Sequence, residues 1–517
     1  MSQSIWRNLV YAVLFLTALL VFYCFGKNTK SRHDRTVLKP SIPFIGHMIG
    51  MATQQIGYFH HLYEKNPVDI ATLPMLMGHI HVIFDLQLMQ KALSSRAMSF
   101  EPLLIPLARP LLGLSPSVMQ AIYSGMLSSL MHATRPALTG KPLTHLNSVA
   151  LGALVEHLDD EMLQVEELEV SDLYRWLGIA LTIATGRALY GSQSPLSRDR
   201  SLIDDLWSFK NGSQRLLVNI LPTITASKAY KARERLVSAL TPLFEVSMQD
   251  TIEDVSRVRA RVHREFGNTG ARDIARCEVA MLHVATVNTT PLLFWTVVHV
   301  FSRPDLVEAI RTECMALVEV SSPESPTDSM QVTIDASQIG RKCPMLMACY
   351  RETCRLNGQP LLVRLVSEDV VMNKGHDGRS QHLIDAESQV MMPAGVTHRL
   401  EEVWGPDASE FRPERFIGWP DTATSAQRSA FTPFGSGRHI CPGRHLAQSE
   451  ILGLVLILCL GYDMRSADGP EMAIRIPTMS TPLLGSAVGE PAAHEDLVGI
   501  KIRRRCGWDR VSWRFVS

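Results

Sequence analysis

Neither charge sign is in excess in this 517-residue chain, which carries 51 basic and 51 acidic side chains. The balance gives no sign of the basic surface that nucleic-acid binding requires. The nine cysteines include no pair at C-x-x-C spacing, and their number is odd. We therefore expect neither a secreted disulfide framework nor a zinc site built on paired cysteines, and reduced cytosolic thiols fit better.

Long linkers, internal repeats and low-complexity tracts are also lacking. Length alone would favour two or three domains of ~100–200 residues each. However, no stretch rich in proline, glycine and serine divides the chain. Apolar residues make up 46% and charged residues 20%, which is a globular composition. The sequence therefore favours one large domain over residues 47–517.

An uncharged apolar run occupies residues 9–25 at the N-terminus. A helix of this length is at the short end of the ~17–25 residues that span a bilayer. A cleaved signal peptide is the alternative, but the bulky residues at the end of the run do not resemble a small-residue cleavage site. Basic residues lie mainly after the run, so the positive-inside rule places the rest of the chain in the cytosol. We expect a membrane anchor over residues 1–26 and a basic, proline-rich connector over residues 27–46.

Helical periodicity dominates the rest of the chain. Apolar residues recur at three- and four-residue steps over residues 151–170, 226–266, 271–301 and 344–356. Short strand-like segments occupy residues 70–73, 80–84, 361–366 and 389–392, and a turn is expected at residues 393–395. The pattern predicts a mainly α fold with a small β part.

The most informative stretch is a glycine-rich loop over residues 431–443, with Cys441 just ahead of an apolar helical segment over residues 446–460. Glycines let a backbone approach a ligand closely, and a helix N-terminus favours an anion such as a thiolate. Arg438 could pair with a carboxylate of a bound cofactor. The alternative interpretation is a buried cysteine with a purely structural role.

This loop resembles the haem-binding loop of the cytochrome P450 family, F-x-x-G-x-R-x-C-x-G, at Phe434, Gly437, Cys441 and Gly443, with Arg438 one position ahead of the arginine of the pattern, where this chain has His439. Four residues at fixed spacing should coincide by chance in about one chain of this length in a thousand. The resemblance implies the cytochrome P450 fold after one transmembrane helix. It also implies a bound haem b whose iron takes the Cys441 thiolate as axial ligand, and Arg438, Phe434, Gly437 and Gly443 as cofactor-binding residues.

Glu352 and Arg355 are spaced as an ordinary surface ion pair on a helix would be. Arg415, which precedes the cysteine loop, completes a set that is similar to the Glu–Arg–Arg network of the family. The resemblance implies that these three residues hold the fold around the haem and take no part in the chemistry.

The segment over residues 271–301 contains Asn288, Thr289 and Pro291. Pro291 should kink the helix and leave the carbonyl of Val287 without its usual partner. The segment resembles the oxygen-binding helix of the family, in the branch of bile-acid-pathway sterol hydroxylases and prostacyclin synthase. The resemblance implies Thr289 and Asn288 as catalytic residues. Because Asn288 stands where relatives carry an acid and cannot ionise, proton delivery should depend on hydroxyl groups and ordered water.

Two further cofactor contacts follow from the same resemblance. Arg364, in the strand-like segment at residues 361–366, is implied to reach a haem propionate. The Trp-x-x-x-Arg pattern of many family members is not evident near residues 120–140, where His132 or Arg135 could take its place.

The resemblance as a whole implies a monooxygenase of the endoplasmic reticulum membrane, with its catalytic domain facing the cytosol. NADPH-cytochrome P450 reductase would supply the electrons. Similar fungal biosynthetic enzymes suggest a terpenoid, steroid or alkaloid substrate in secondary metabolism, and the apolar segments at residues 102–118 and 216–224 favour a substrate that partitions into lipid. The alternatives are a haem-thiolate isomerase or dehydratase that needs no reductase, and a haem protein that only binds a ligand.

Overall fold

The computed structural model describes residues 36–40, 46–75, 78–163, 165–245, 252–267, 270–321, 330–374, 380–467, 473–483, 485–492, 497–508 and 511–516. The expected membrane anchor at residues 1–26 lies outside these ranges, as does most of the connector at residues 27–46.

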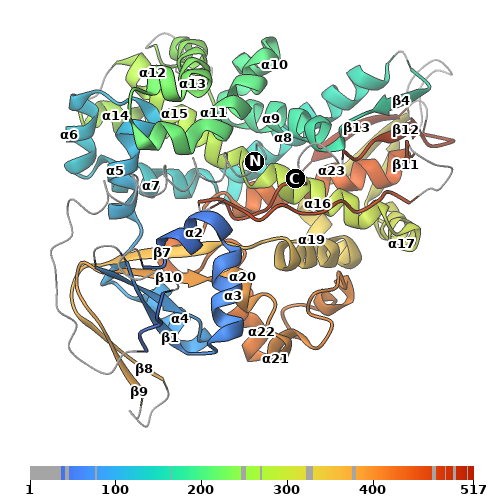
Figure 1. Ribbon diagram of the computed structural model, residues 1–517. Helices are drawn as coiled ribbons and strands as arrows, with labels where there is room; N and C mark the ends of the chain where they lie inside the picture. The colour runs from blue at the N-terminus through green and yellow to red at the C-terminus, as the bar shows by residue number, and fades with distance from the viewer. Residues whose placement is uncertain are drawn as a thin grey trace, which may run out of the picture.

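Two apolar helices run through the interior of a helical body, α16 (Thr289–Phe301) and α23 (Arg444–Gly461). Every residue of α16 is buried, as expected for a helix that is apolar on all sides. Figure 1 shows the helices that surround them. The longer ones are α5 (Glu101–Leu112), α6 (Pro116–Tyr123), α7 (Met126–Ala137), α8 (Gly140–Met162), α9 (Leu173–Tyr190), α11 (Ser201–Val218), α13 (Ser227–Leu240), α14 (Asp254–Glu265), α15 (Ala271–Thr286), α17 (Pro304–Met315) and α19 (Pro344–Leu356).

Shorter helical turns connect these elements. They are α10 (Pro195–Arg198), α12 (Pro222–Thr225), η2 (Thr241–Phe244), α18 (Ile339–Lys342), α20 (Ala394–Thr397), α21 (Glu401–Trp404), η5 (Pro413–Phe416), α22 (Ser425–Ala430) and η6 (Gly437–His439).

Two helical stretches among the described residues are long and apolar enough to cross a membrane, Ala271–Phe301 and Arg444–Gly461. Their apolar windows are 78% and 72% buried inside the protein. Both are therefore core helices of the folded body, and they give no support to a membrane span.

A five-stranded sheet lies at the other end of the molecule from α11 and α13 (Figure 1). Its strands run in the order β1 (Ile70–Pro74), β2 (His79–Ile83), β10 (Gln389–Pro393), β7 (Leu361–Val366) and β3 (Met98–Ser99). Only the pairing of β10 with β2 is parallel. Apolar residues of β1 and β2 form one core cluster with α2 (Met48–Gln54) and α3 (Gly57–Lys65), so these helices cover one face of the sheet.

The remaining strands form two three-stranded sheets and one hairpin. One sheet contains β11 (Tyr462–Ser466), β12 (Ile500–Arg504) and β4 (Glu167–Val170). The other contains β13 (Val511–Val516), β6 (Met330–Asp335) and β5 (Val318–Ser321). The hairpin of β8 (Val370–Lys374) and β9 (Ser380–Ile384) projects away from the body in Figure 1.

The mainly α fold with a small β part is confirmed, and the four strand-like segments of the sequence correspond to β1, β2, β7 and β10. The periodic stretch at residues 226–266 divides into α13, η2 and α14. The prediction of a hairpin-type turn at residues 393–395 was wrong, because the helical turn α20 follows β10 directly.

One carboxyl group lies in the helical core. Glu450 of α23 is 1% exposed, and the hydroxyl of Thr185 on α9 donates a hydrogen bond of 2.8 Å to Glu450 Oε1. Burial raises the pKa of Glu450 to about 8. The side chain therefore stays mostly neutral at pH 7, which is how a carboxyl group is tolerated inside an apolar helix.

Glu450→Gln is expected to change the pH dependence of stability. Because the folded pKa is raised, the favourable contribution is complete below the unfolded pKa, near 4.5, and is lost as the pH rises through about 8. The glutamine variant should match the wild type near pH 5 and exceed it by roughly 3–5 kcal/mol above pH 8. Urea unfolding at both pH values measures this difference, and parallel pH curves for the two proteins would contradict it.

Candidate functional site

The cysteine loop is held in a fixed shape ahead of α23. The Cys441 backbone N–H donates a hydrogen bond of 3.0 Å to the Phe434 carbonyl oxygen and closes the loop. Gly437 has φ +65°, and a Cβ there would overlap the carbonyl oxygen of Leu93 on α4 (Leu86–Ser94). Only glycine can occupy that position, because the backbone is left-handed and the loop presses against α4.

The thiol of Cys441 lies where two backbone N–H groups point toward it. Burial raises its pKa above the usual range, while hydrogen bonds from the Gly443 and Arg444 backbones and the charge of Arg444 act in the opposite direction. The Cα of Gly443 is close to this sulfur, since a Cβ there would lie 4.0 Å from Cys441 Sγ. The sulfur is thus prepared to become an anion once a cation binds it.

Arg364 of β7 is a buried cation without a carboxylate partner among the described residues. Its side chain is buried, Nη1 donates 2.8 Å to the Val363 carbonyl, and Nε is buried without a hydrogen bond. Burial lowers the pKa of Arg364 to about 10. A buried guanidinium in this condition is suited to an anionic group of a ligand.

Two more arginines approach the same place, beside His439. Arg135 of α7 donates a hydrogen bond from Nη2 to the Arg438 carbonyl oxygen, which ties α7 to the cysteine loop. Burial lowers the pKa of His439, and the nearby charges of Arg364, Arg438 and Arg135 lower it further. Glu101 is the one acid that opposes them, so positive charge is in excess here.

His132 lies on α7, three residues before Arg135. It is exposed and forms no hydrogen bond or ion pair within the described part of the chain. Between the two candidates from the sequence, the structure thus brings Arg135 to the cysteine loop.

The long helix of the sequence is broken at residues 287–288, shortly before Pro291, where a kink was expected. α15 ends at Thr286 and α16 begins at Thr289. The Thr289 hydroxyl donates a hydrogen bond of 2.8 Å to the Ala285 carbonyl oxygen across the break. Val284, five residues before Thr289, is 61% exposed, whereas Leu282 is buried.

Asn288 reaches from the break to the C-terminal segment at residues 485–490. Its Oδ1 accepts 2.8 Å from the Ala487 backbone N–H and 3.3 Å from the Ser486 hydroxyl. The carboxamide oxygen is therefore already committed and cannot also accept from a water in a relay. Sequence reasoning missed this contact, since residues 485–490 form no regular element and carry no motif.

Strand β7 connects the two halves of the site. Just before it, the Gln359 backbone N–H donates 2.6 Å to the Ala487 carbonyl. Within it, Leu362 lies 3.6 Å from the Cβ position of Gly435 in the cysteine loop. The helix break and the cysteine loop are thus positioned by a common strand.

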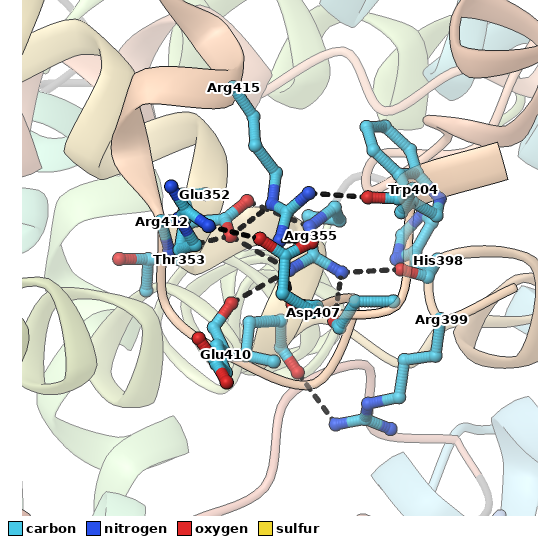
Figure 2. A network of polar contacts seen from close by, with 12 residues as sticks. Glu352, Thr353, Arg355, His398, Arg399, Trp404, Asp407, Glu410, Arg412 and Arg415 are labelled. Atoms are coloured by element: carbon cyan, nitrogen blue, oxygen red, sulfur yellow. Dashed lines mark hydrogen bonds and ion pairs between the residues drawn. The ribbon is translucent and has the colours of Figure 1, made fainter. Parts of the chain in front are cut away.

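A polar network fixes the region behind the loop (Figure 2). Glu352 and Arg355 of α19 are both fully buried, and Arg355 donates two hydrogen bonds, of 2.7 and 2.8 Å, to the Glu352 carboxylate. Arg415 Nε lies 3.4 Å from Glu352 Oε1. The structure therefore brings together the three residues that the sequence grouped.

The rest of the network consists mainly of backbone groups. Arg355 also donates 2.7 Å to the carbonyls of His398 and Ala408, and its guanidinium lies 5.3 Å from the Trp404 ring centroid. Arg415 donates to the Trp404 carbonyl and pairs with Asp407 at 2.6 Å. The buried Arg355 and the partly buried Arg415 thus hold segments that have little regular structure of their own.

Comparison with known proteins agrees with this geometry. The family model "Cytochrome P450" matches residues 219–465. A cytochrome P450 monooxygenase of Gibberella zeae is 33% identical over 98% of this chain and 96% of its own length. The chain belongs to the cytochrome P450 family. Cytochrome P450 monooxygenase nodJ of Hypoxylon pulicicidum is 28% identical over 97% of both chains, and 25-hydroxycholesterol 7-alpha-hydroxylase of Rattus norvegicus is 24% identical over 68% of this chain and 85% of its own.

This P450 is a monooxygenase, an oxidoreductase that uses haem iron held by a cysteine thiolate and takes electrons from a redox partner. The described residues fit that cofactor. The loop offers a thiol at a helix N-terminus, and the guanidinium groups beside it outnumber the acids, which suits the two propionates of a haem.

Proposed function

We propose that this P450 oxidises a hydrophobic small molecule of the terpenoid, steroid or alkaloid type in secondary-metabolite biosynthesis. The observation that carries the proposal is the loop around Cys441 with its unbalanced arginines, together with the helix break before Thr289, near which Val284 is 61% exposed. The name of the rat relative describes the hydroxylation of a sterol, and that similarity favours a polycyclic isoprenoid skeleton.

The haem would be held by residues from the cysteine loop, β7 and α7. Cys441 would ligate the iron, and Arg364, Arg438 and Arg135 would bind the propionates, with His132 an alternative on α7. Phe434, Gly437 and Gly443 would set the shape of the loop. A thiolate-ligated haem supplies the O2 chemistry of the family when it is bound.

The Thr289 hydroxyl is positioned to accept a hydrogen bond from a proton-bearing group at the helix break. Its hydrogen is used in the bond to the Ala285 carbonyl, so the oxygen keeps its lone pairs for a proton-bearing group on the open side. Thr290 is buried beside it and is a second hydroxyl for the same task.

Asn288 has a different task in this proposal, which is to position the segment at residues 485–490 against the helix. Asn288→Leu removes the acceptor of the Ala487 N–H, an unsatisfied group that costs about 1–3 kcal/mol. We expect this variant to change the distribution of oxidation sites on the substrate and to lower the yield of product per NADPH consumed. Asn288→Asp keeps an oxygen acceptor and should preserve both. Product analysis by mass spectrometry measures the effect, and a leucine variant with unchanged products would remove the positioning role.

The remaining proposals concern the membrane anchor, the electron donor and the entry of the substrate. We infer that residues 1–26 anchor the protein in the endoplasmic reticulum membrane, that residues 27–46 connect the anchor, and that residues 47–517 form the catalytic domain on the cytosolic side. NADPH-cytochrome P450 reductase would then be the electron donor. Ile220, Leu221 and Ile224 are 53%, 65% and 73% exposed around α12, and this apolar surface suits entry of a substrate from lipid.

Co-expression with NADPH-cytochrome P450 reductase and a panel of terpenoid, steroid and alkaloid precursors tests the function. We expect an oxygenated product of one of these classes, formed only with O2 and NADPH present. Product formed anaerobically without NADPH would instead establish an isomerase or dehydratase. If a substrate of another class were the only one oxidised, the proposed skeleton would be wrong while the monooxygenase chemistry stood.

A further inference from the structure

Three side chains that commonly bind metals meet on the five-stranded sheet. His79 and His81 come from β2, and Asp385 directly follows β9. One nitrogen or oxygen atom from each lies within 4.8 Å of the other two. His81 is 1% exposed, and the side chains of His79 and Asp385 are 14% and 16% exposed, so the cluster is buried at one end and accessible at the other.

The strand geometry places both imidazoles on one face. Residues two apart in a strand point the same way, so His79 and His81 share a face and Ile80 and Val82 share the other. Ile80 and Val82 belong to the core cluster under α2 and α3. The histidine face is therefore the one that meets the β8–β9 hairpin, whose end carries Asp385.

The distances suit a metal of small radius. His79 Nε2 lies 3.4 Å from Asp385 Oδ2. Two ligands of a tetrahedral zinc ion are also about 3.4 Å apart when the bonds are ~2.0–2.2 Å long. The imidazole rings of His79 and His81 have centroids 4.8 Å apart and meet at 75°, and the ligand atoms of all three residues lie within 4.8 Å of one another.

A neighbouring hydroxyl sets the orientation of the buried histidine. Thr72 of β1 is directly opposite His81 in the ladder, and its Oγ1 lies 3.2 Å from His81 Nδ1. When Nδ1 donates to this oxygen, Nε2 keeps its lone pair, which is the tautomer that ligates a metal. His81 Nε2 is itself a buried atom.

We propose that His79, His81 and Asp385 bind one Zn²⁺ ion, with a water as the fourth ligand. Two imidazoles and one carboxylate form a donor set that zinc accepts readily. The ion would fasten the end of the β8–β9 hairpin to β2, because Asp385 is the only one of the three that the hairpin supplies. The site is built from other residues than those around Cys441 and does not depend on the substrate of the enzyme.

The experiment uses the untagged holoenzyme, equilibrated with ZnCl2 at neutral pH and then passed through metal-free buffer. Zinc and haem iron are measured together by elemental analysis. We expect about one zinc per haem in the wild type and in His61→Ala, a histidine variant on the exposed side of α3. His81→Ala and His79→Gln should retain none, and the latter keeps the fold testable because His79 is partly exposed.

Thr72→Val gives a second, graded measurement. Loss of a group that orients a ligating histidine weakens metal binding about 10–100-fold. We expect zinc to raise the melting temperature of the wild type, and the valine variant to need correspondingly more zinc for the same rise. No retained zinc in the wild type, or equal zinc in His79→Gln, would overturn the site and leave an ordinary histidine–aspartate ion pair.

Discussion

Glu352→Ala is expected to yield no haem-loaded protein. Glu352 is fully buried and accepts both hydrogen bonds from Arg355, together with one of 2.9 Å from the Arg412 backbone N–H. Removing it leaves the Arg355 charge buried without a counter-ion, which costs about 3–5 kcal/mol. Domains are stable by only about 5–15 kcal/mol, so the loss removes a large part of the total.

The effect should exceed that of breaking an exposed ion pair. Arg175 and Asp204 are 49% and 57% exposed at 2.7 Å, and Asp204→Ala should cost about 0–1 kcal/mol. Glu352→Gln, which keeps the shape and one acceptor, should fall between the two. Haem content per protein and the urea midpoint measure all three variants. An alanine variant with normal haem content and an unchanged midpoint would show that Glu352 carries no such role.

Regular elements were predictable from the sequence because their cause is local. β1, β2, β7 and β10 alternate or concentrate apolar residues over a few positions, and α19 and α23 repeat them at helical spacing. The stretch at residues 226–266 keeps that spacing throughout, yet η2 follows α13, and Pro242 lies within it. Periodicity reports which face is buried and does not report where a chain turns.

The residues of the site also fall into those that the sequence could predict and those that it could not. Cys441, Glu352 and Arg415 belong to spaced patterns, and the structure places Cys441 in a closed loop and the other two in a polar network. The partners of Asn288 could not be found, because Ser486 and Ala487 are about two hundred positions away and meet it only through tertiary packing. Likewise, spacing on α7 did not separate His132 from Arg135, since the choice depends on where the carbonyl of Arg438 lies.

Cys441→Ala should abolish the thiolate signature of the haem. The reduced protein with CO absorbs at a position that depends on the axial ligand, and sulfur donation from a thiolate gives a characteristic band. We expect the wild type to show this band and the alanine variant to lose it completely, together with monooxygenase activity, because alanine offers no atom to the iron.

A matched thiol variant separates this effect from general damage. Cys506 is exposed and lies outside the cysteine loop, so Cys506→Ala should keep the band and the activity. Other cysteines are poor substitutes as ligands, since burial raises the pKa of Cys354 and Cys459 to about 12 and both stay protonated. His439 is an alternative donor, since it lies two residues before Cys441 and its Nδ1 is buried. If haem in Cys441→Ala kept the thiolate band, another sulfur would have to be the ligand. If it acquired the spectrum of an imidazole-ligated haem, His439 would have moved onto the iron, and the double variant with His439→Ala should lose that spectrum as well.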